Sequence, residues 1–222
     1  MPHPYLSFSD STNCKGKVLG TSNYQKEGNG LTNPYVSYIQ IPPKYENVKV
    51  VEIGYRSLTG TNVIGIFIPK TIQFIAHDAF WNCKKLSDVR FEKGSQLKTF
   101  ASCVFQDCTS LKNVDIPPST KEIAGSSTDY MFKLTSAVTC FSYLGSTDFS
   151  TAYVFYNTPT IHVSDSIYPA GKQFGQRNVI RDGKTCGTSN EPFYKNICNV
   201  SILVRKCHPN LMSVIILLMV SS

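Results

Sequence analysis

The chain has 222 residues, of which 41% are hydrophobic and 17% are charged, and this balance disfavours a wholly disordered protein. Its 12 Tyr, 13 Phe, 14 Gly and 12 Pro suit many short strands broken by turns better than a helical bundle. The formal net charge is +7, but no basic run exceeds two residues, which disfavours a nucleic-acid-binding surface.

The first 34 residues are predicted to form an irregular N-terminal cap. They start Met-Pro-His-Pro-Tyr-Leu-Ser-Phe-Ser-Asp, without the basic start and long apolar core of a secretory signal. The triplet Gly28-Asn29-Gly30 favours a turn near the end of this segment. We therefore expect residues 1–34 to flank the main domain, and we expect no leader peptide in them.

An internal repeat occupies the middle of the chain. Residues 68–91 read IPKTIQFIAHDAFWNCKKLSDVRF, and residues 96–116 read QLKTFASCVFQDCTSLKNVDI. A shift of 25 residues pairs six positions of these segments, including Phe80 with Phe105, and all six are apolar or Cys. The large apolar anchor of each unit recurs at Leu58, Phe80, Phe105, Phe132 and Phe155. Self-similarity at this spacing is typical of a stacked repeat protein.

Each unit of the repeat predicts one short strand and a return segment. In Val89-Arg90-Phe91 the apolar side chains alternate with a polar one, as in a strand with one buried side. Proline ends the strands at Pro69 and Pro117, where no further ladder donor is needed. A second apolar row lies at Ile53, Ile75, Phe100 and Ile123. Because one unit cannot bury both apolar sides, residues 35–165 should stack as about five coils with a short parallel β-sheet on one face.

The repeat resembles that of the BspA-like proteins, also described as the Treponema pallidum type of leucine-rich repeat. The first copy matches that repeat at Ile68-Pro69, Ile72, Ile75, Ala79-Phe80, Asn82-Cys83, Leu86, Val89 and Phe91. The second copy keeps the pattern except at Val104, where the family has Ala. The segments TSAVTCFSYLG and IHVSDSIYPAGKQFG are similar to surface BspA-like proteins of trichomonad parasites. The resemblance covers about residues 35–175 and implies a leucine-rich-repeat solenoid, mostly turns on its second face, with little helix.

The resemblance also implies a function. BspA-like proteins are often cell-surface or secreted adhesins that bind matrix proteins or other cells, and some carry a C-terminal transmembrane helix. It therefore implies a non-catalytic surface or secreted binding protein, a surface antigen whose partner is a protein or glycan ligand. An intracellular interaction scaffold is the alternative, favoured by the missing leader. We expect no cofactor, no metal ion and no nucleic-acid partner.

The outward side chains of the strands form the predicted ligand-binding surface. Parallel stacking aligns them in two rows, and an ordinary solvated sheet face is the equal alternative for these rows. The row that contains Asp88 and Asn113 also contains Gly65, Cys140 and Thr160. The residues predicted to contact a ligand are Phe67, which we expect to be exposed, Asp88, Arg90, Asn113, Asp115, Ser142 and His162.

The eight cysteines have several open roles. Cys83 and Cys108 share a column on neighbouring coils, where a disulfide is geometrically feasible, but we favour two buried small apolar side chains. Cys103 and Cys108 form a C-x4-C pattern with no second pair, which is a weak metal signal. A zinc cluster, a disulfide pair and plain thiols all remain open for the tail residues Cys186, Cys198 and Cys207-His208, although the spacing disfavours zinc.

Catalysis is not predicted. The nucleophile and phosphate-binding motifs G-x-S-x-G, G-x-G-x-x-G and G-x4-G-K-[ST] are absent from the sequence. His77 is expected on a turn and His162 on a strand, and no pattern joins either one to a thiol.

Residues 166–222 are predicted to form a closing strand or loop followed by a basic, partly disordered tail. This segment contains seven Lys or Arg residues and only two acidic residues, Asp182 and Glu191. The apolar stretch Leu211–Val220 is about half of the roughly 20 residues that a membrane-spanning helix needs. It is expected to cap the last coil, dip into a membrane surface or be the remnant of a longer helix.

Overall fold

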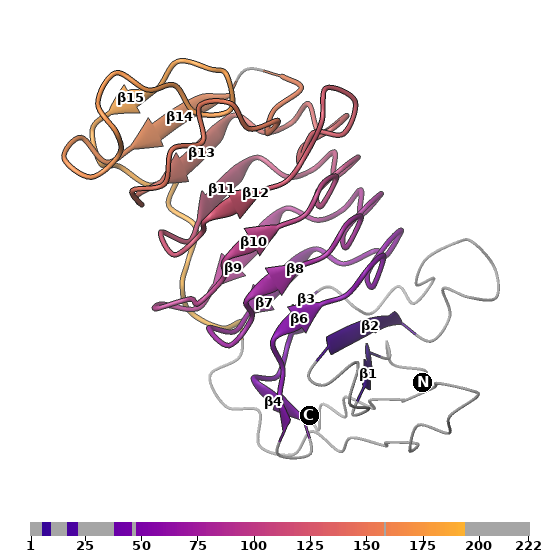
Figure 1. Ribbon diagram of the computed structural model, residues 1–222. Coiled ribbons are helices and arrows are strands. Elements are labelled where there is room, and N and C mark those ends of the chain that lie inside the picture. Colours follow the sequence, from indigo (N-terminus) through magenta and orange to yellow (C-terminus); the bar gives the residue numbers. More distant parts are fainter. Residues whose placement is uncertain (1–5, 10–16, 22–37, 46–47, 158, 194–222) are drawn as a thin grey trace.

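Short parallel strands stacked along one axis build the described part of the chain, as the repeat predicted (Figure 1). The computed structural model describes residues 6–9, 17–21, 38–45, 48–157 and 159–193. Within these residues the chain forms strands, turns and bends and no helix. The predicted solenoid with little helix is therefore confirmed.

The first column of strands carries the two outward rows that the sequence predicted. Phe67 pairs in register with Arg90, and Ser142 lies between Asp115 and His162. The column holds two sheets, ordered β3-β7-β9 and β11-β13-β14-β15. Its strands are β3 (Tyr38–Gln40), β7 (Gly65–Ile68), β9 (Asp88–Phe91), β11 (Asn113–Ile116), β13 (Cys140–Tyr143), β14 (Thr160–Val163) and β15 (Ile180–Arg181).

The second column consists of two-residue strands that lie on another side of the coils. They are β6 (Glu52–Ile53), β8 (Phe74–Ile75), β10 (Thr99–Phe100) and β12 (Glu122–Ile123). Residues 1–34, predicted as an irregular cap, contain β1 (Leu6–Ser9) and β2 (Lys17–Thr21), and β2 extends this column by pairing with β6. A separate hairpin joins β4 (Lys44–Tyr45) to β5 (Val48–Lys49). The column is parallel from β2 to β12.

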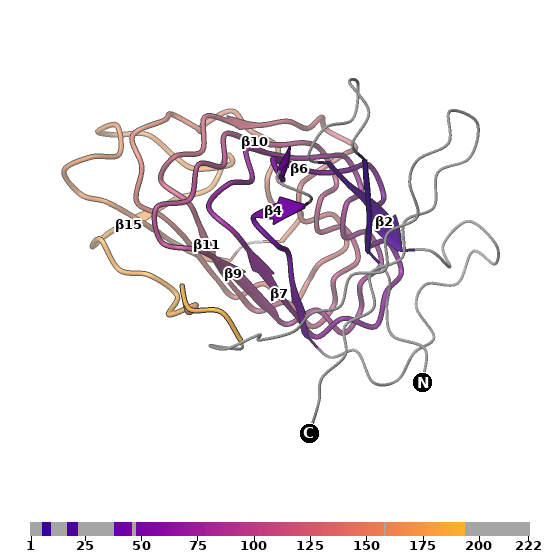
Figure 2. The same cartoon turned by 90° about the horizontal axis from the view of Figure 1, so that it is seen from below.

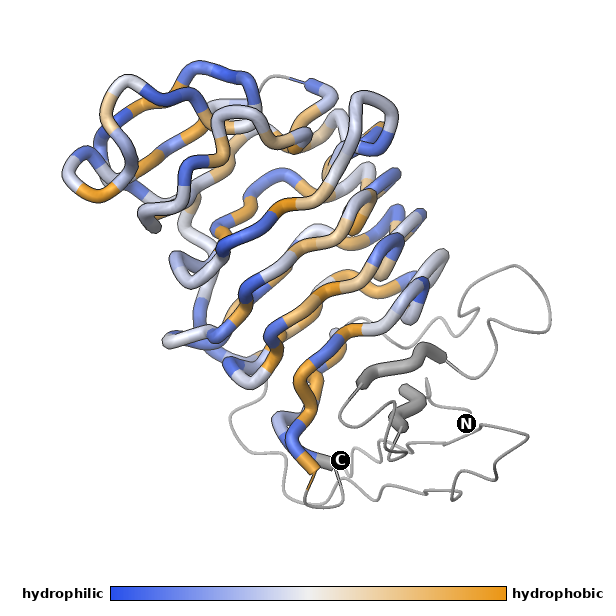
Figure 3. The backbone as a smooth tube through the Cα atoms, viewed as in Figure 1, coloured by the Kyte–Doolittle hydropathy of each residue, from blue (hydrophilic) through white to orange (hydrophobic). Residues whose placement is uncertain are grey.

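The anchor phenylalanines form a continuous file along the core. The ring centroids of Phe80 and Phe105 lie 5.3 Å apart, those of Phe105 and Phe132 lie 5.4 Å apart, and those of Phe132 and Phe155 lie 5.7 Å apart. All four side chains are fully buried. Figure 3 shows the matching alternation of apolar and polar residues along each coil. The repeat spacing predicted this file. Dispersion contacts between the rings and the burial of their apolar surface stabilise the stacked coils.

A column of small donors lies three residues after the anchors Phe80, Phe105 and Phe132. The Cys83 thiol donates to the carbonyl oxygen of Leu58 at 2.9 Å, and the Cys108 thiol donates to that of Phe80 at 3.2 Å. Thr135 occupies the next position and donates its hydroxyl to the carbonyl of Phe105. The two cysteines are buried free thiols, so the favoured reading of them is confirmed and the alternative disulfide is not formed. Each donor satisfies a main-chain carbonyl of the preceding coil.

The chain between β14 and β15 closes the last coil. Phe174 is fully buried against Phe141 and Tyr143, with ring centroids 5.1 and 5.6 Å away. The Arg181 guanidinium donates to the carbonyl oxygens of Tyr168 and Pro169 and so fixes β15 in place. Among the residues that the structure describes, no helix is long and apolar enough to cross a membrane. The predicted disordered tail and the apolar stretch Leu211–Val220 lie outside the described residues.

Candidate functional site

Residues 182–193, here called the strap, cross the outward side of the first strand column, here called the strand face. The strap meets the strands in reverse order, with Asp182 at β14, Cys186 at β13, Thr188 at β11 and Phe193 at β9. In Figure 2 this segment runs outside β11 and β9. The surface predicted to bind a ligand is therefore partly occupied by the chain itself.

A disulfide between Cys140 and Cys186 tethers the strap to β13. The sequence analysis allowed Cys186 a role in a zinc cluster, in a disulfide or as a plain thiol. The structure shows the disulfide. Its partner Cys140 comes from the outward row rather than from the tail. A cysteine in an outward strand position, where the equivalent residues are Asn113 and Thr160, was the available signal for this pairing.

Asp115 is the main polar contact of the strap. Its carboxylate accepts hydrogen bonds from the main-chain amides of Cys186 and Thr188, at 2.6 and 2.8 Å. It also accepts from the Thr188 hydroxyl at 2.7 Å and from the hydroxyl of Ser142 on the neighbouring strand. Four donors fill the acceptor capacity of one carboxylate, and hydrogen bonds to an ionised group are stronger than neutral ones.

Arg90 holds the far end of the strap. Its guanidinium carbon lies 4.1 Å from the centre of the Phe193 ring, and its Nη1 donates to the carbonyl oxygen of Glu191 at 3.2 Å. Asp88 accepts three hydrogen bonds from Arg90 at 2.7–3.1 Å and so fixes the guanidinium plane. This arrangement combines a cation–π contact with a main-chain hydrogen bond.

Gly65 provides the space for the Phe193 ring. A Cβ atom on Gly65 would lie 2.6 Å from Cζ of Phe193 and 2.5 Å from Cδ1 of Tyr38. The Tyr38 and Phe193 ring centroids lie 4.6 Å apart. Glycine within a strand often marks a close approach by another group, and here that group is the aromatic end of the strap.

At its other end the strap is fixed by hydrogen bonds to Asp182. His162 Nδ1 lies 2.9 Å from Oδ1 of Asp182, and the Lys184 amide donates to the same oxygen at 3.1 Å. Desolvation acts to raise the pKa of Asp182, but the hydrogen bonds from Lys184 and His162 outweigh it and lower the pKa from its ordinary value. The carboxylate is therefore ionised at neutral pH and accepts both bonds.

The predicted ligand residues have different surroundings. Asn113 is exposed, whereas Asp88, Arg90, Asp115 and His162 are half-buried. Ser142 is 1% exposed. The expectation that Phe67 is exposed is wrong, since the ring is 7% exposed. It sits on the middle strand of its sheet, with Gln40 and Arg90 on either side.

A cavity of about 260 Å³ opens beside the strap, at the ends of β9, β11 and β13. Phe91, Ile116 and Pro117 give it an apolar wall. Lys93, Thr188 and Asn190 are among the polar residues that line it. The strap thus covers part of the strand face and adds a wall to this cavity.

A second cluster lies at the turn edge of the coils. Ligand atoms of His77, Asp78 and Cys103 all lie within 4.8 Å of one another. Asp78 already pairs with Arg56 Nε at 2.9 Å and His77 Nδ1 at 2.8 Å, so a metal ion would have to compete with the guanidinium. Burial, followed by the charges of Asp129 and Asp78, raises the pKa of Cys103 to about 11 and keeps the thiol protonated.

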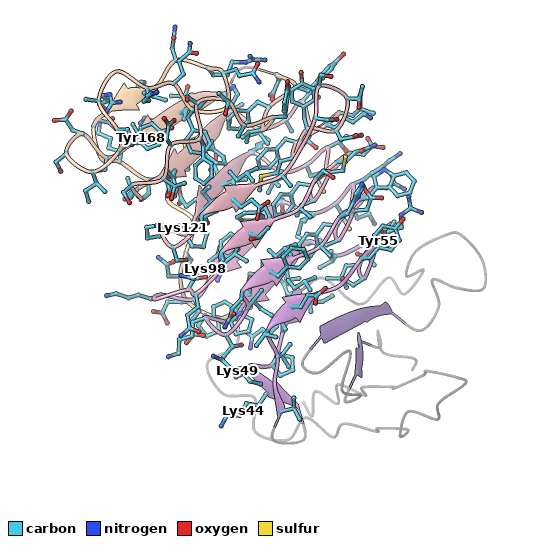
Figure 4. All side chains as sticks on the ribbon, in the orientation of Figure 1. Lys44, Lys49, Tyr55, Lys98, Lys121 and Tyr168 are labelled. Carbon is cyan, nitrogen blue, oxygen red and sulfur yellow. A yellow bond between two sulfur atoms is a disulfide. The ribbon has the colours of Figure 1, made fainter. Side chains whose placement is uncertain are left out.

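Arg56 is itself held by aromatic rings. Its guanidinium carbon lies 5.0 Å from the ring centres of both Tyr55 and Trp81. Figure 4 shows Tyr55 at the turn edge, on the other side of the coils from Lys98 and Lys121. The fixed position of Arg56 favours a structural ion pair with Asp78 over a metal site.

A family model described as "BspA type Leucine rich repeat region" matches residues 33–164, in six copies. No curated protein sequence matches the chain. A leucine-rich repeat protein from Bacteroides capillosus is 22% identical to it, over 64% of this chain and 95% of its own, with a TM-score of 0.48. The T. pallidum Leucine Rich Repeat protein is 17% identical, over 64% and 70%, with a TM-score of 0.44. The pneumococcal vaccine antigen PcpA is 16% identical, over 56% and 36%, with a TM-score of 0.44.

Proposed function

The chain belongs to the BspA-type leucine-rich-repeat family, and on this basis we propose that it is a non-catalytic binding protein, secreted or displayed at the cell surface. Its partner in this proposal is a protein or glycan ligand. Leucine-rich-repeat proteins generally bind other proteins, which supports the role in recognition.

The chemistry of the free cysteines supports a non-catalytic role. Cys83, Cys103 and Cys108 are buried thiols. Burial raises the pKa of Cys83 and Cys103 to about 11 and that of Cys108 well above its ordinary value. A cysteine nucleophile reacts as the thiolate, and such thiols supply almost none at neutral pH.

The observation that carries the proposed location is the Cys140–Cys186 disulfide. Disulfides persist in oxidising compartments and outside cells, and they are rare in the cytosol. The bond therefore supports an exported protein over the alternative of an intracellular scaffold.

We place the ligand on the strand face with the strap in position. One margin of the strap leaves Asn113 exposed near the start of β11. The other margin holds the 260 Å³ cavity, which has apolar walls and polar groups such as Thr188 and Asn190. An aromatic or aliphatic side chain of a partner fits a cavity of this size and lining.

Surface labelling tests this function. Intact source cells are treated with a membrane-impermeant biotin reagent, with a cytosolic protein as the internal control. The purified chain is then assayed on immobilised matrix proteins, next to a variant with Asn113→Arg and Asn190→Arg. We expect labelling of intact cells and weaker binding by the variant. Labelling only after lysis would favour the intracellular scaffold.

A further inference from the structure

The strap contacts the strand face partly through its main chain, as a bound peptide ligand would. Asp115 accepts the amides of Cys186 and Thr188, which lie on either side of Gly187, a residue with a φ of +78°. Arg90 donates to the carbonyl of Glu191. These bonds use main-chain groups, and the pair of amides on Asp115 also uses the left-handed conformation of Gly187, which side-chain-bearing residues rarely adopt. The contacts that depend on strap side chains are the Cys186 disulfide, Asp182 with His162, the Thr188 hydroxyl on Asp115, and the Phe193 ring against Arg90 and Tyr38.

The hydrophobic core is complete without the strap. The buried core cluster extends to Phe174, and it includes no residue from 182 to 193. No strap residue belongs to a strand in the described sheets, since β15 ends at Arg181. Lys184, Gly187 and Asn190 are exposed. Removing the strap would therefore leave the coils packed.

The surface beneath the middle of the strap is polar, whereas the strap's last residue, Phe193, packs against the Tyr38 ring. This polar surface contains the half-buried charged side chains of Asp88, Arg90 and Asp115. At its end, Gly65 leaves space for an aromatic ring. A permanent cover would be expected to bury apolar side chains, because these contribute most to stability. Charged groups with hydrogen-bonding capacity are instead suited to a contact that can exchange with water or with another peptide.

We propose that the strand face is a groove for a peptide segment of a partner, and that the strap is an autoinhibitory occupant tethered by Cys140–Cys186. The matching partner segment carries Gly followed by Ser or Thr and, five positions after that hydroxyl residue, an aromatic ring. The inference goes beyond the proposed function, in which the ligand binds beside the strap, because here a partner peptide takes the strap's own place.

Opening of the groove requires a dithiol reductant. One of its thiolates attacks a sulfur of the Cys140–Cys186 bond, forms a mixed disulfide, and releases the other cysteine as a thiolate that takes up a proton. The second thiol of the reductant then closes its own disulfide. Both cysteines become thiols, and the dithiol is oxidised. Without the tether, the strap is held only by non-covalent contacts, and a peptide in solution can compete for them.

The test uses the full chain and its own strap sequence as the probe. The open variant combines Cys140→Ser, Cys186→Ser, Thr188→Ala and Phe193→Ala, which removes the disulfide and the Thr188 and Phe193 side-chain contacts and keeps Arg90, Asp115 and Gly65. The probe is a fluorescein-labelled peptide of residues 182–193 with Ser at position 186. A matched control peptide also has Ala at positions 188 and 193.

We expect the probe to bind the open variant at least tenfold more tightly than it binds the oxidised wild type. On the same open variant, the probe should bind tenfold more tightly than the control peptide. Adding Asp115→Ala should weaken binding about tenfold, whereas Glu122→Ala on the second strand column should not. Equal binding of both peptides, or no binding to an open variant that melts like the wild type, would overturn the inference. Because the probe is the chain's own segment, the result does not depend on cell-surface location.

A second readout follows release of the strap directly. Trypsin cleavage after Lys184 should accelerate at least tenfold when dithiothreitol reduces the wild type, while cleavage within the coils stays slow. Unchanged cleavage after complete reduction would show that the disulfide does not control the strap.

Discussion

The carboxylate of Asp115 is bonded to both the amide and the hydroxyl of Thr188, 73 residues further along the chain. Asp115 comes from the middle of the strand face, and Thr188 comes from the strap. This contact, together with the Cys140–Cys186 disulfide, turns an open strand face into one that is partly covered by its own chain.

Removing the Asp115 carboxylate should loosen the strap without unfolding the coils. We expect Asp115→Ala to lower the free energy of unfolding by about 2 kcal/mol, the order expected for hydrogen bonds to a charged group. Urea denaturation measures this change, and Glu122→Ala is the control because its carboxylate lies on the second strand column. Equal effects of the two substitutions would argue against the role of Asp115.

The file of anchor phenylalanines should dominate stability. Phe105→Ala is expected to lower the free energy of unfolding by about 3–5 kcal/mol, because it leaves a cavity between Phe80 and Phe132. Phe74→Ala should have an effect below about 1 kcal/mol, since that ring points outward from β8 and is 36% exposed. Similar losses in both variants would contradict the assignment of the core.

The donor column makes a prediction with two isosteric variants. Cys108→Thr can donate to the carbonyl of Phe80 as Thr135 does to that of Phe105, whereas Cys108→Val cannot. Thermal and urea denaturation should show the Val variant to be less stable than the Thr variant by about 1 kcal/mol. A Val variant at least as stable as the Thr variant would mean that the position selects only for size.

The free thiols should be unreactive at neutral pH. The pKa of Cys83 and Cys103 is raised to about 11, first by burial, so the thiolate fraction is small at pH 8 and grows only as the pH approaches 11. Iodoacetamide should alkylate these residues slowly in the native protein at pH 8 and rapidly in denaturant. Rapid native alkylation of Cys103 would contradict the assignment of this residue as a buried, protonated thiol.

The coils could be predicted from the sequence because the apolar residues that make them stack recur at regular intervals. Phe80, Phe105 and Phe132 recur at matched positions, and a repeat of this kind can bury its apolar sides only by stacking. The same register placed Asp115 beside Ser142 and Ser142 beside His162, as the structure has them.

The strap was not predicted because it has no repeat. Its contacts join residues far apart in sequence, such as Arg90 to Glu191, and main-chain bonds to Asp115 leave no pattern in the strap's side chains. Phe67 was placed in the correct row but wrongly expected to be exposed, because alternation gives the direction of a side chain and not what covers it. The residues that pointed to the strap were Cys140 and Gly65, each unusual for an outward strand position.

The most direct test of the covered strand face is a disulfide map of the protein purified from its source cells under non-reducing conditions with free thiols blocked. Trypsin should yield the peptides 134–172 and 185–195 as one cross-linked species, joined through Cys140 and Cys186, which separates on reduction. Recovery of the two peptides apart, each with a blocked thiol, would contradict a strap tethered across the strand face.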